Sequence, residues 1–124
     1  MLQNDERVVC FATCPGGSNV SLMAYKAASM LEKEGFGKFI RLAGDRAKDL
    51  DQKRLEEASK YAKQWVLIEG CNKGCGKKIF DTAGIQPDEH LLITNLGIER
   101  ENKIDYSKDE LEKVLKAVKA ILTN

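Results

Sequence analysis

Four short and continuously apolar runs, separated by helical patterns, are spaced along this chain of 124 residues. Runs that are apolar at every position are typical of strands buried on both faces, and such strands alternate with helices in parallel sheets. The pattern therefore predicts an α/β fold, as a single three-layer α/β/α domain over residues 1–124 with a mostly parallel sheet of about four strands. The expected strands are residues 7–12, 38–43, 65–68 and 91–94.

Helix-start and helix-stop residues lie between these runs. Ser18 can cap a first helix, and Gly35 can end it. A charged second helix is expected over residues 51–63, and a short third helix closes at Gly84. The last helix opens on residues 107–110, whose Ser-Lys-Asp-Glu sequence is a capping box. These signals place helices in each gap of the predicted sheet.

The charge balance argues against nucleic-acid binding, and the cysteine count points to metal binding or thiol chemistry. Lys and Arg total 20 against 19 Asp and Glu, so the net charge is +1, without the basic excess of a nucleic-acid-binding surface. No run approaches the roughly 20 apolar residues of a membrane span, and residues 1–7 are too polar for a signal-peptide core. We therefore expect the cytoplasm, where the four cysteines would serve metal binding or catalysis rather than disulfides.

Three cysteines fall at one edge of the predicted sheet. Cys14 follows the first strand and Cys71 follows the third, and the carboxyl ends of parallel strands share an edge where ligands bind. Cys75 is four residues beyond Cys71 across a helix start, which favours the thiolate and brings both sulfurs within reach of one ion. The spacing of these cysteines predicts a metal site at this edge.

Other residues near this edge are assigned by position. Cys10, four residues before Cys14, spans roughly 13 Å from it in an extended chain, so it either packs in the core or joins the ion through a chain that curls back. Asp45 could supply an oxygen ligand or be a solvated loop carboxylate. His90 opens the fourth strand and is expected about 20 Å away, as no ligand. Trp65 is expected in the core.

Several segments together are similar to one family, the DGC-domain proteins, which are small prokaryotic proteins named for an Asp-Gly-Cys motif. The segments that carry the resemblance are residues 14–20 (CPGGSNV), 42–44 (LAG), 69–79 (EGCNKGCGKKI) and 94–98 (TNLGI). The resemblance implies a zinc site built from scattered cysteines, with Cys14, Cys71 and Cys75 matching the pattern. In this chain Glu69 stands in place of the Asp of the Asp-Gly-Cys motif, and Arg41 stands where the family often has a cysteine. The fourth ligand would then be Cys10, Asp45 or water.

The leading hypothesis is a zinc protein with a thiolate-rich site, acting in metal handling or sensing or as an enzyme with an open zinc position. Copper(I) or an iron–sulfur cluster are alternative occupants. The second hypothesis is a thiol redox protein or cysteine-based enzyme, with Cys14 or Cys75 as nucleophile and Cys71 resolving. A phosphocysteine carrier, using the glycine-rich loop at 16–19, and a partner-binding module, using a charged lid at 99–106, are lesser alternatives. The protein partner is left open.

Overall fold

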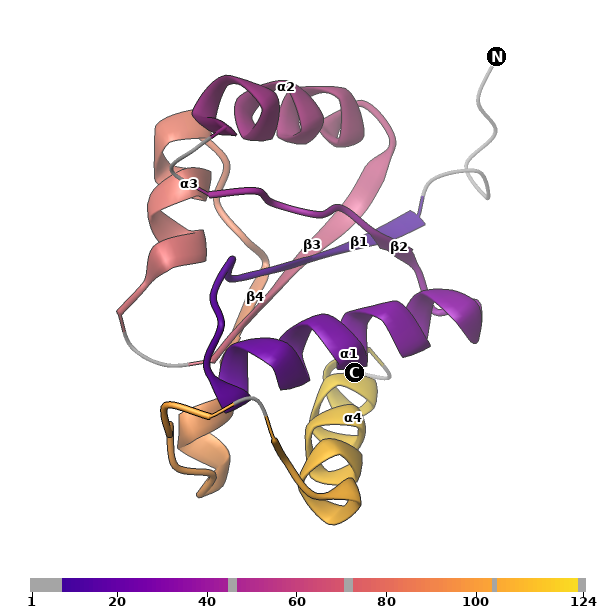
Figure 1. Cartoon of the computed structure of the whole chain (residues 1–124). Coiled ribbons are helices and arrows are strands. Elements are labelled where there is room, and N and C mark those ends of the chain that lie inside the picture. The colour runs from indigo at the N-terminus through magenta and orange to yellow at the C-terminus, as the bar shows by residue number, and fades with distance from the viewer. Residues whose placement is uncertain (1–7, 45–46, 71–72, 104, 123–124) are drawn as a thin grey trace.

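The computed structural model describes residues 8–44, 47–70, 73–103 and 105–122. Its elements alternate along the chain (Figure 1). They are β1 (Val8–Thr13), α1 (Asn19–Lys33), β2 (Lys38–Phe39), α2 (Lys48–Ser59), β3 (Ala62–Glu69), α3 (Cys75–Ala83), β4 (Glu89–Leu92), the 3-10 helix η3 (Ile93–Leu96) and α4 (Lys108–Leu122).

The strands form one sheet in the order β2-β1-β3-β4, and every pairing is parallel. Figure 1 shows α2 and α3 on one face of this sheet and α1 and α4 on the other. The predicted α/β class and three-layer arrangement are therefore confirmed. β1 and β3 are the central strands of the sheet, and β2 and β4 are its edge strands.

Each face of the sheet has its own apolar layer. Phe11, Val66 and Ile68 point toward α1 and α4, where they pack against Leu31 and Val118. On the opposite face, apolar side chains of β1 and β3 pack against α2 and α3; this second layer contains Cys10, Ala12, Ile40, Leu55, Ala58, Trp65, Leu67 and Phe80. As predicted, Trp65 is in the core, with its ring edge-on to Phe80 at 5.2 Å between centroids. Strands buried on both faces explain the uninterrupted apolar runs.

The predicted helix caps are present. The Ser18 side chain accepts a hydrogen bond from the Ser21 N–H at the start of α1. Ser107 and Glu110 exchange side-chain and backbone hydrogen bonds of 2.9 and 3.1 Å, which is the reciprocal pattern of a capping box. Among the described helices, none is long and apolar enough to cross a membrane.

The second strand and the second helix differ from the sequence prediction. β2 covers only Lys38–Phe39, because the N–H groups of Ala43 and Gly44 are bound by the buried Asp51 carboxylate at 2.6 and 2.8 Å instead of by a neighbouring strand. The expected helix over 51–63 is instead Lys48–Ser59, since Ala62 already pairs with Val8 in the sheet.

The third and fourth strands also have different bounds. β3 extends to Glu69, beyond the apolar run at 65–68. β4 is Glu89–Leu92 rather than 91–94, because the chain turns into η3 at Ile93. The N–H of Thr94 then donates to the Gly70 carbonyl at 3.1 Å, which holds this turn against the end of β3. The first strand, expected at 7–12, is observed from Val8; Arg7 lies outside the described residues.

Candidate functional site

The carboxyl ends of β1 and β3 form the point of the sheet where the chain connections diverge. β1 leads through α1 to β2 on one side, whereas β3 leads through α3 to β4 on the other. Open parallel sheets bind ligands in the crevice at such a point. Cys14 follows β1 directly, and Gly70 follows β3 directly. The backbone N–H of Gly70 donates to Sγ of Cys14 at 3.2 Å, so the two loops meet at this thiol.

Cys14 is buried among polar groups rather than in the apolar layers. Its Sγ lies 3.5 Å from Oγ of Ser21, and that hydroxyl is also bound by the Ser18 hydroxyl at 3.1 Å. Burial raises the pKa of the Cys14 thiol above its ordinary value, and the nearby charges of Glu69 and Cys75 add to this effect, although the hydrogen bonds from Ser21 and Gly70 oppose it. The net direction favours the neutral thiol over the thiolate.

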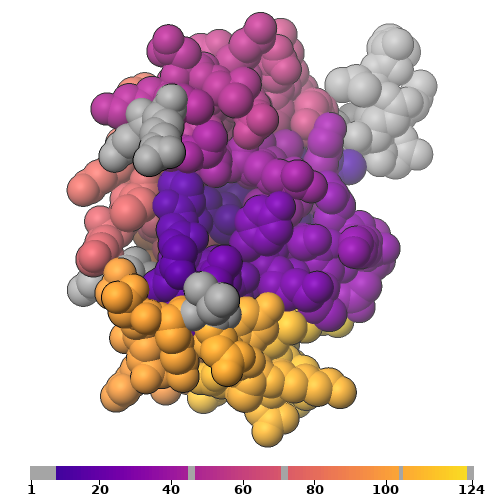
Figure 2. Space-filling model, in the orientation of Figure 1, coloured from indigo at the N-terminus to yellow at the C-terminus, as the bar shows by residue number. Residues whose placement is uncertain are grey.

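Cys75 is the first residue of α3 and its side chain is exposed. Gly74 precedes it in the left-handed conformation, with φ of 72°, a turn that favours glycine and sets the direction of the helix. The thiols of Cys14 and Cys75 and the carboxylate of Glu69 line one cavity of about 210 Å³. In Figure 2 the indigo segment after β1 lies beside the salmon-coloured α3, at the edge where these loops meet. The structure thus brings two of the predicted site cysteines to one cavity.

Glu69 is a buried carboxylate with two partners. Its Oε1 accepts a 2.6 Å hydrogen bond from the Gly76 N–H in the first turn of α3. Its Oε2 lies 2.6 Å from Nε2 of His90 on β4. Glu69 is fully buried, so its carboxylate oxygens depend on these protein partners in place of water. The carboxylate therefore links the end of β3 to the start of the helix that carries Cys75.

The expected remoteness of His90 is wrong. β4 is only four residues long and is staggered along β3, so that His90 lies opposite Leu67, two residues from the carboxyl end of the strand. Its ring consequently reaches Glu69, which itself lines the cavity of Cys14 and Cys75. That His90 is no metal ligand stays a prediction.

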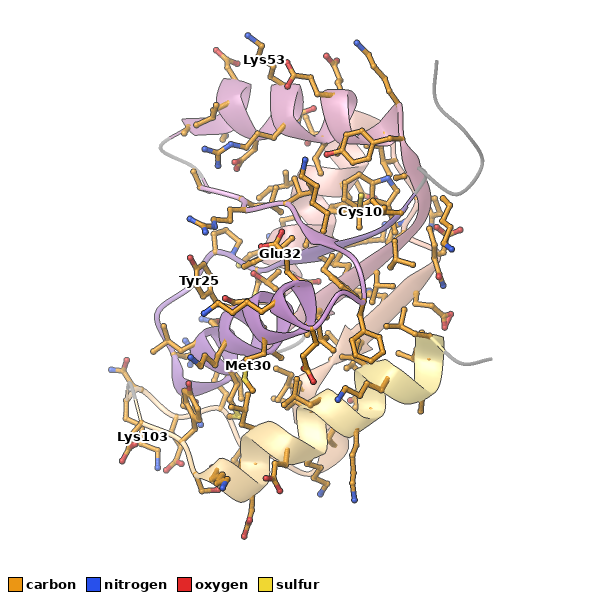
Figure 3. All side chains as sticks on the ribbon, turned by 90° about the vertical axis from the view of Figure 1, so that its right-hand side faces the viewer. Cys10, Tyr25, Met30, Glu32, Lys53 and Lys103 are labelled. Carbon is orange, nitrogen blue, oxygen red and sulfur yellow. The ribbon has the colours of Figure 1, made fainter. Side chains whose placement is uncertain are left out.

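The remaining candidate ligands are Cys10, Cys71 and Asp45. Cys10 is fully buried inside β1, between the sheet and α2, and packs in the apolar layer with Trp65 and Phe80 (Figure 3). β1 stays extended through Thr13, which pairs with Ile68. Burial raises the pKa of the Cys10 thiol to about 11. Cys71 and Asp45 lie outside the described residues. Within the described ranges, no three His, Cys, Asp or Glu side chains are placed to share one metal ion.

A loop from the far end of the chain completes the cavity. The buried Asn19 side chain donates to the Glu99 carbonyl at 3.0 Å and accepts from the Glu101 N–H at 2.7 Å. Arg100, between these two residues, lines the cavity together with Lys73. Part of the predicted lid at 99–106 is therefore docked on the first turn of α1. This role of Asn19 cannot be predicted from the sequence, because an asparagine after a cap residue gives no signal of a contact about eighty residues away.

A comparison with known protein families gives a match over most of the chain. The model of the DGC domain matches residues 10–118, which is most of the chain. The chain belongs to the DGC domain family. The match spans β1 to α4 and includes every cysteine, so the DGC domain here comprises both halves of the sheet and both loops of the candidate site. Neither a curated protein nor a solved structure gives a significant match to the chain.

The part of the DGC site that sequence reasoning missed is the Glu69–His90 pair. A carboxylate at the end of a continuously apolar strand is a signal in itself, because a charged side chain that is buried there requires a partner. Its partner could not be inferred, since it depends on the stagger between β3 and β4.

Proposed function

We propose that this protein binds a zinc ion at the carboxyl edge of the sheet, through the thiolates of Cys14, Cys75 and Cys71, the last of which precedes Cys75 by four residues in the sequence. The observation that carries the proposal is the shared cavity of about 210 Å³, where Cys14, Cys75 and the Glu69 carboxylate meet. Thiolates select soft or borderline cations over magnesium or calcium, and zinc is the commonest such ion at sites of scattered cysteines.

The charges around Cys14 favour a cation in this cavity. Glu69 and Cys75 both raise the pKa of the Cys14 thiol, so three groups that can be anionic stand close together in one cavity. A bound cation would reverse this effect and stabilise the thiolate. The Gly70 N–H would remain a hydrogen-bond donor to the Cys14 sulfur, and the Ser21 hydroxyl, which accepts from the thiol, can turn to donate to the thiolate. Such donors are typical of the outer shell of metal thiolates.

Glu69 and His90 support the site without needing to bind the ion. Both carboxylate oxygens of Glu69 already have partners, in the Gly76 N–H and the His90 ring. Through Gly76 the carboxylate fixes the first turn of α3 and with it the position of Cys75. We therefore assign Glu69 as a positioning residue, and we leave the fourth position of the ion to water or to Asp45.

The exposure of Cys75 favours a role in metal handling or sensing in a reducing cytoplasm. An exposed ligand can be displaced by a ligand from a partner, so that the ion passes on without the core unfolding. Zinc with an open position would supply Lewis-acid chemistry, and an enzymatic role follows from the same geometry if a substrate takes that position.

A thiol redox function with the same cysteines is the alternative. The raised pKa of Cys14 argues against Cys14 as the nucleophile, because redox-active cysteines have lowered pKa values. Cys75, exposed at a helix start, remains the candidate nucleophile for that alternative. Cys71 would be its resolving partner.

Metal analysis of a serine series separates the two functions. Protein purified without oxygen is expected to hold about one zinc per chain, and Cys14→Ser, Cys71→Ser and Cys75→Ser each to lose most of it. Cys10→Ser is the matched control, because Cys10 lies in the apolar layer, and it is expected to keep its zinc. Metal-free protein with a reversible Cys71–Cys75 or Cys14–Cys71 disulfide would instead establish the redox function.

A further inference from the structure

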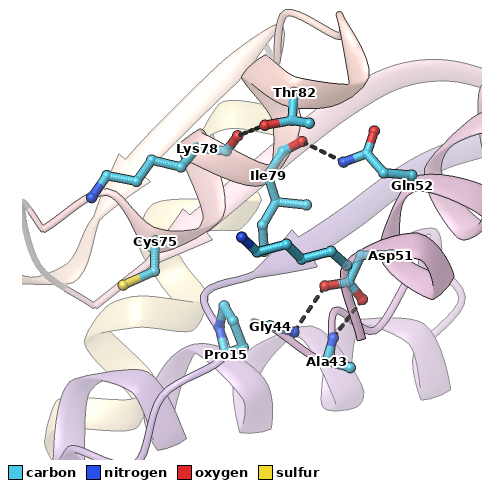
Figure 4. A pocket seen from close by; sticks show the side chains of 10 residues that line it. Pro15, Ala43, Gly44, Asp51, Gln52, Cys75, Lys78, Ile79 and Thr82 are labelled. Atoms are coloured by element: carbon cyan, nitrogen blue, oxygen red, sulfur yellow. Dashed lines mark hydrogen bonds between the residues drawn. The ribbon is translucent and has the colours of Figure 1, made fainter. Parts of the chain in front are cut away.

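A second and larger cavity adjoins the thiol site. It has a volume of about 590 Å³ and lies between α2 and α3, outside the carboxyl ends of β1 and β2. It shares Pro15 and Cys75 with the smaller cavity, and the Cys75 thiol stands at its margin (Figure 4). Cavities of this size at the carboxyl edge of a parallel sheet are typical of small-molecule sites.

The walls of this cavity are fixed by hydrogen bonds. The Asp51 carboxylate binds the N–H groups of Ala43 and Gly44, as the dashed lines in Figure 4 show. The Gln52 side chain donates to the Ile79 carbonyl at 3.3 Å and so connects α2 to α3. A site with walls held in this way requires little ordering when a ligand enters.

Among the described residues that line this cavity, the charged groups without a partner are positive. Lys48 and Lys78 both line it, and neither ammonium group has a hydrogen bond or an ion pair among the described residues. The neighbouring Lys77, by contrast, is paired with Asp81. The only carboxylate among the described lining residues, that of Asp51, is almost fully buried and already bound by two backbone N–H groups. In a chain with a net charge of only +1, this is a local excess of cationic groups.

Apolar surface adjoins these charges. Pro15, Ala43 and Ile79 line the same cavity. A ligand that fits must therefore combine an anionic group with an apolar body, because a bare ion would leave the apolar wall in contact with water.

We propose that this cavity binds a small organic oxyanion, a carboxylate or a phosphate monoester, with its acidic group held by Lys48 and Lys78 and its apolar body on Pro15 and Ile79. The ligand would then lie beside the Cys75 thiol. The proposal does not depend on a metal at the thiol site, because neither lysine is a candidate ligand for it.

The test measures protection of Cys75 in reduced, chelator-treated protein. Iodoacetamide alkylates the thiol with loss of iodide, and its rate is followed on the tryptic peptide 74–77, which cleavage after Lys73 separates from Cys71. Phenyl phosphate and benzoate are the anionic probes, and benzamide is the neutral probe of matched shape. We expect a saturable slowing of alkylation by an anionic probe and none by benzamide.

Charge-removing variants locate the effect. Lys48→Gln with Lys78→Gln is expected to weaken the apparent affinity of the anionic probe about tenfold or more. Arg100→Gln removes the same kind of charge from the smaller cavity and is expected to leave it unchanged. Protection by phenyl phosphate alone, or by benzoate alone, identifies the acidic group.

Three outcomes would overturn the proposal: no protection by either anion, equal protection by benzamide, or unchanged affinity in the lysine double variant with an unchanged unfolding midpoint. Because the protein is metal-free throughout, a failure of zinc binding leaves the result unaffected. A protein that binds zinc but shows no protection contradicts this inference alone.

Discussion

The Gly70 N–H donates to Sγ of Cys14 at 3.2 Å, and this bond joins the loops that follow β1 and β3. The contact requires Gly70 to lie directly against the start of α1. A Cβ at this position would be 2.7 Å from Cγ2 of Val20 and 2.9 Å from the backbone nitrogen of Ser21. The geometry of the thiol site therefore depends on a residue without a side chain.

Gly70→Ala is expected to destabilise the protein by about 1–3 kcal/mol, because the backbone of α1 cannot move aside cheaply. Gly17→Ala is the matched control, since a Cβ at Gly17 meets nothing within 4 Å, and it should change the free energy of unfolding by less than about 0.5 kcal/mol. Urea unfolding measures both variants. Equal stability of the two variants would contradict the close approach of Gly70 to α1.

His90→Ala is expected to cost about 1–3 kcal/mol, because it leaves the fully buried Glu69 carboxylate with one partner instead of two. His90→Gln should recover part of this loss, since its amide N–H can still donate. Asp81→Asn, in the exposed pair with Lys77, serves as the control and should have little effect. Chemical denaturation at neutral pH checks the order, and a His90→Ala variant as stable as the wild type would refute the pair.

The buried Cys10 thiol makes stability depend on alkaline pH. Burial raises its pKa from 9.0 to about 11, so the folded state favours the neutral thiol. This contribution is fully present below pH 9 and is lost as the pH rises through about 11, with a total of about 3 kcal/mol. Unfolding free energies measured between pH 8 and 11 should fall more steeply for the wild type than for Cys10→Ala, which lacks the titrating group. Parallel curves would contradict the assignment.

Asn19→Ala should release the loop at 99–101. The substitution removes both side-chain hydrogen bonds to the backbone of Glu99 and Glu101, at a cost of about 1–3 kcal/mol. Hydrogen exchange at the Glu101 amide should accelerate, whereas Asn95→Ala, at an exposed position, should leave it unchanged. Unaltered exchange in Asn19→Ala would show that other contacts hold the loop.

The alternation of strands and helices could be predicted because local signals agree with the final packing. Ser18, Gly84 and the Ser107–Glu110 capping box mark helix ends by their own hydrogen bonds and backbone angles. β2 was predicted too long because Asp51 binds the backbone of Ala43 and Gly44, a contact with no counterpart in the local pattern.

Only the part of the site that follows from parallel strand ends could be predicted from the sequence. Cys14 and Cys75 follow the ends of strands that share an edge, so their proximity follows from a parallel sheet. The partnership of Glu69 with His90 depends on the stagger of β4 along β3, which no residue pattern specifies. Arg100 reaches the cavity through Asn19, a contact between distant parts of the chain that periodicity cannot reveal.

X-ray absorption at the zinc edge, on anaerobically prepared protein with one equivalent of zinc, tests the central claim most directly. We expect about three sulfur neighbours at about 2.3 Å, and about two in Cys75→Ser. A zinc ion surrounded only by oxygen or nitrogen at about 2.0–2.2 Å, or one that does not stay with the protein, would contradict a thiolate zinc site at this edge.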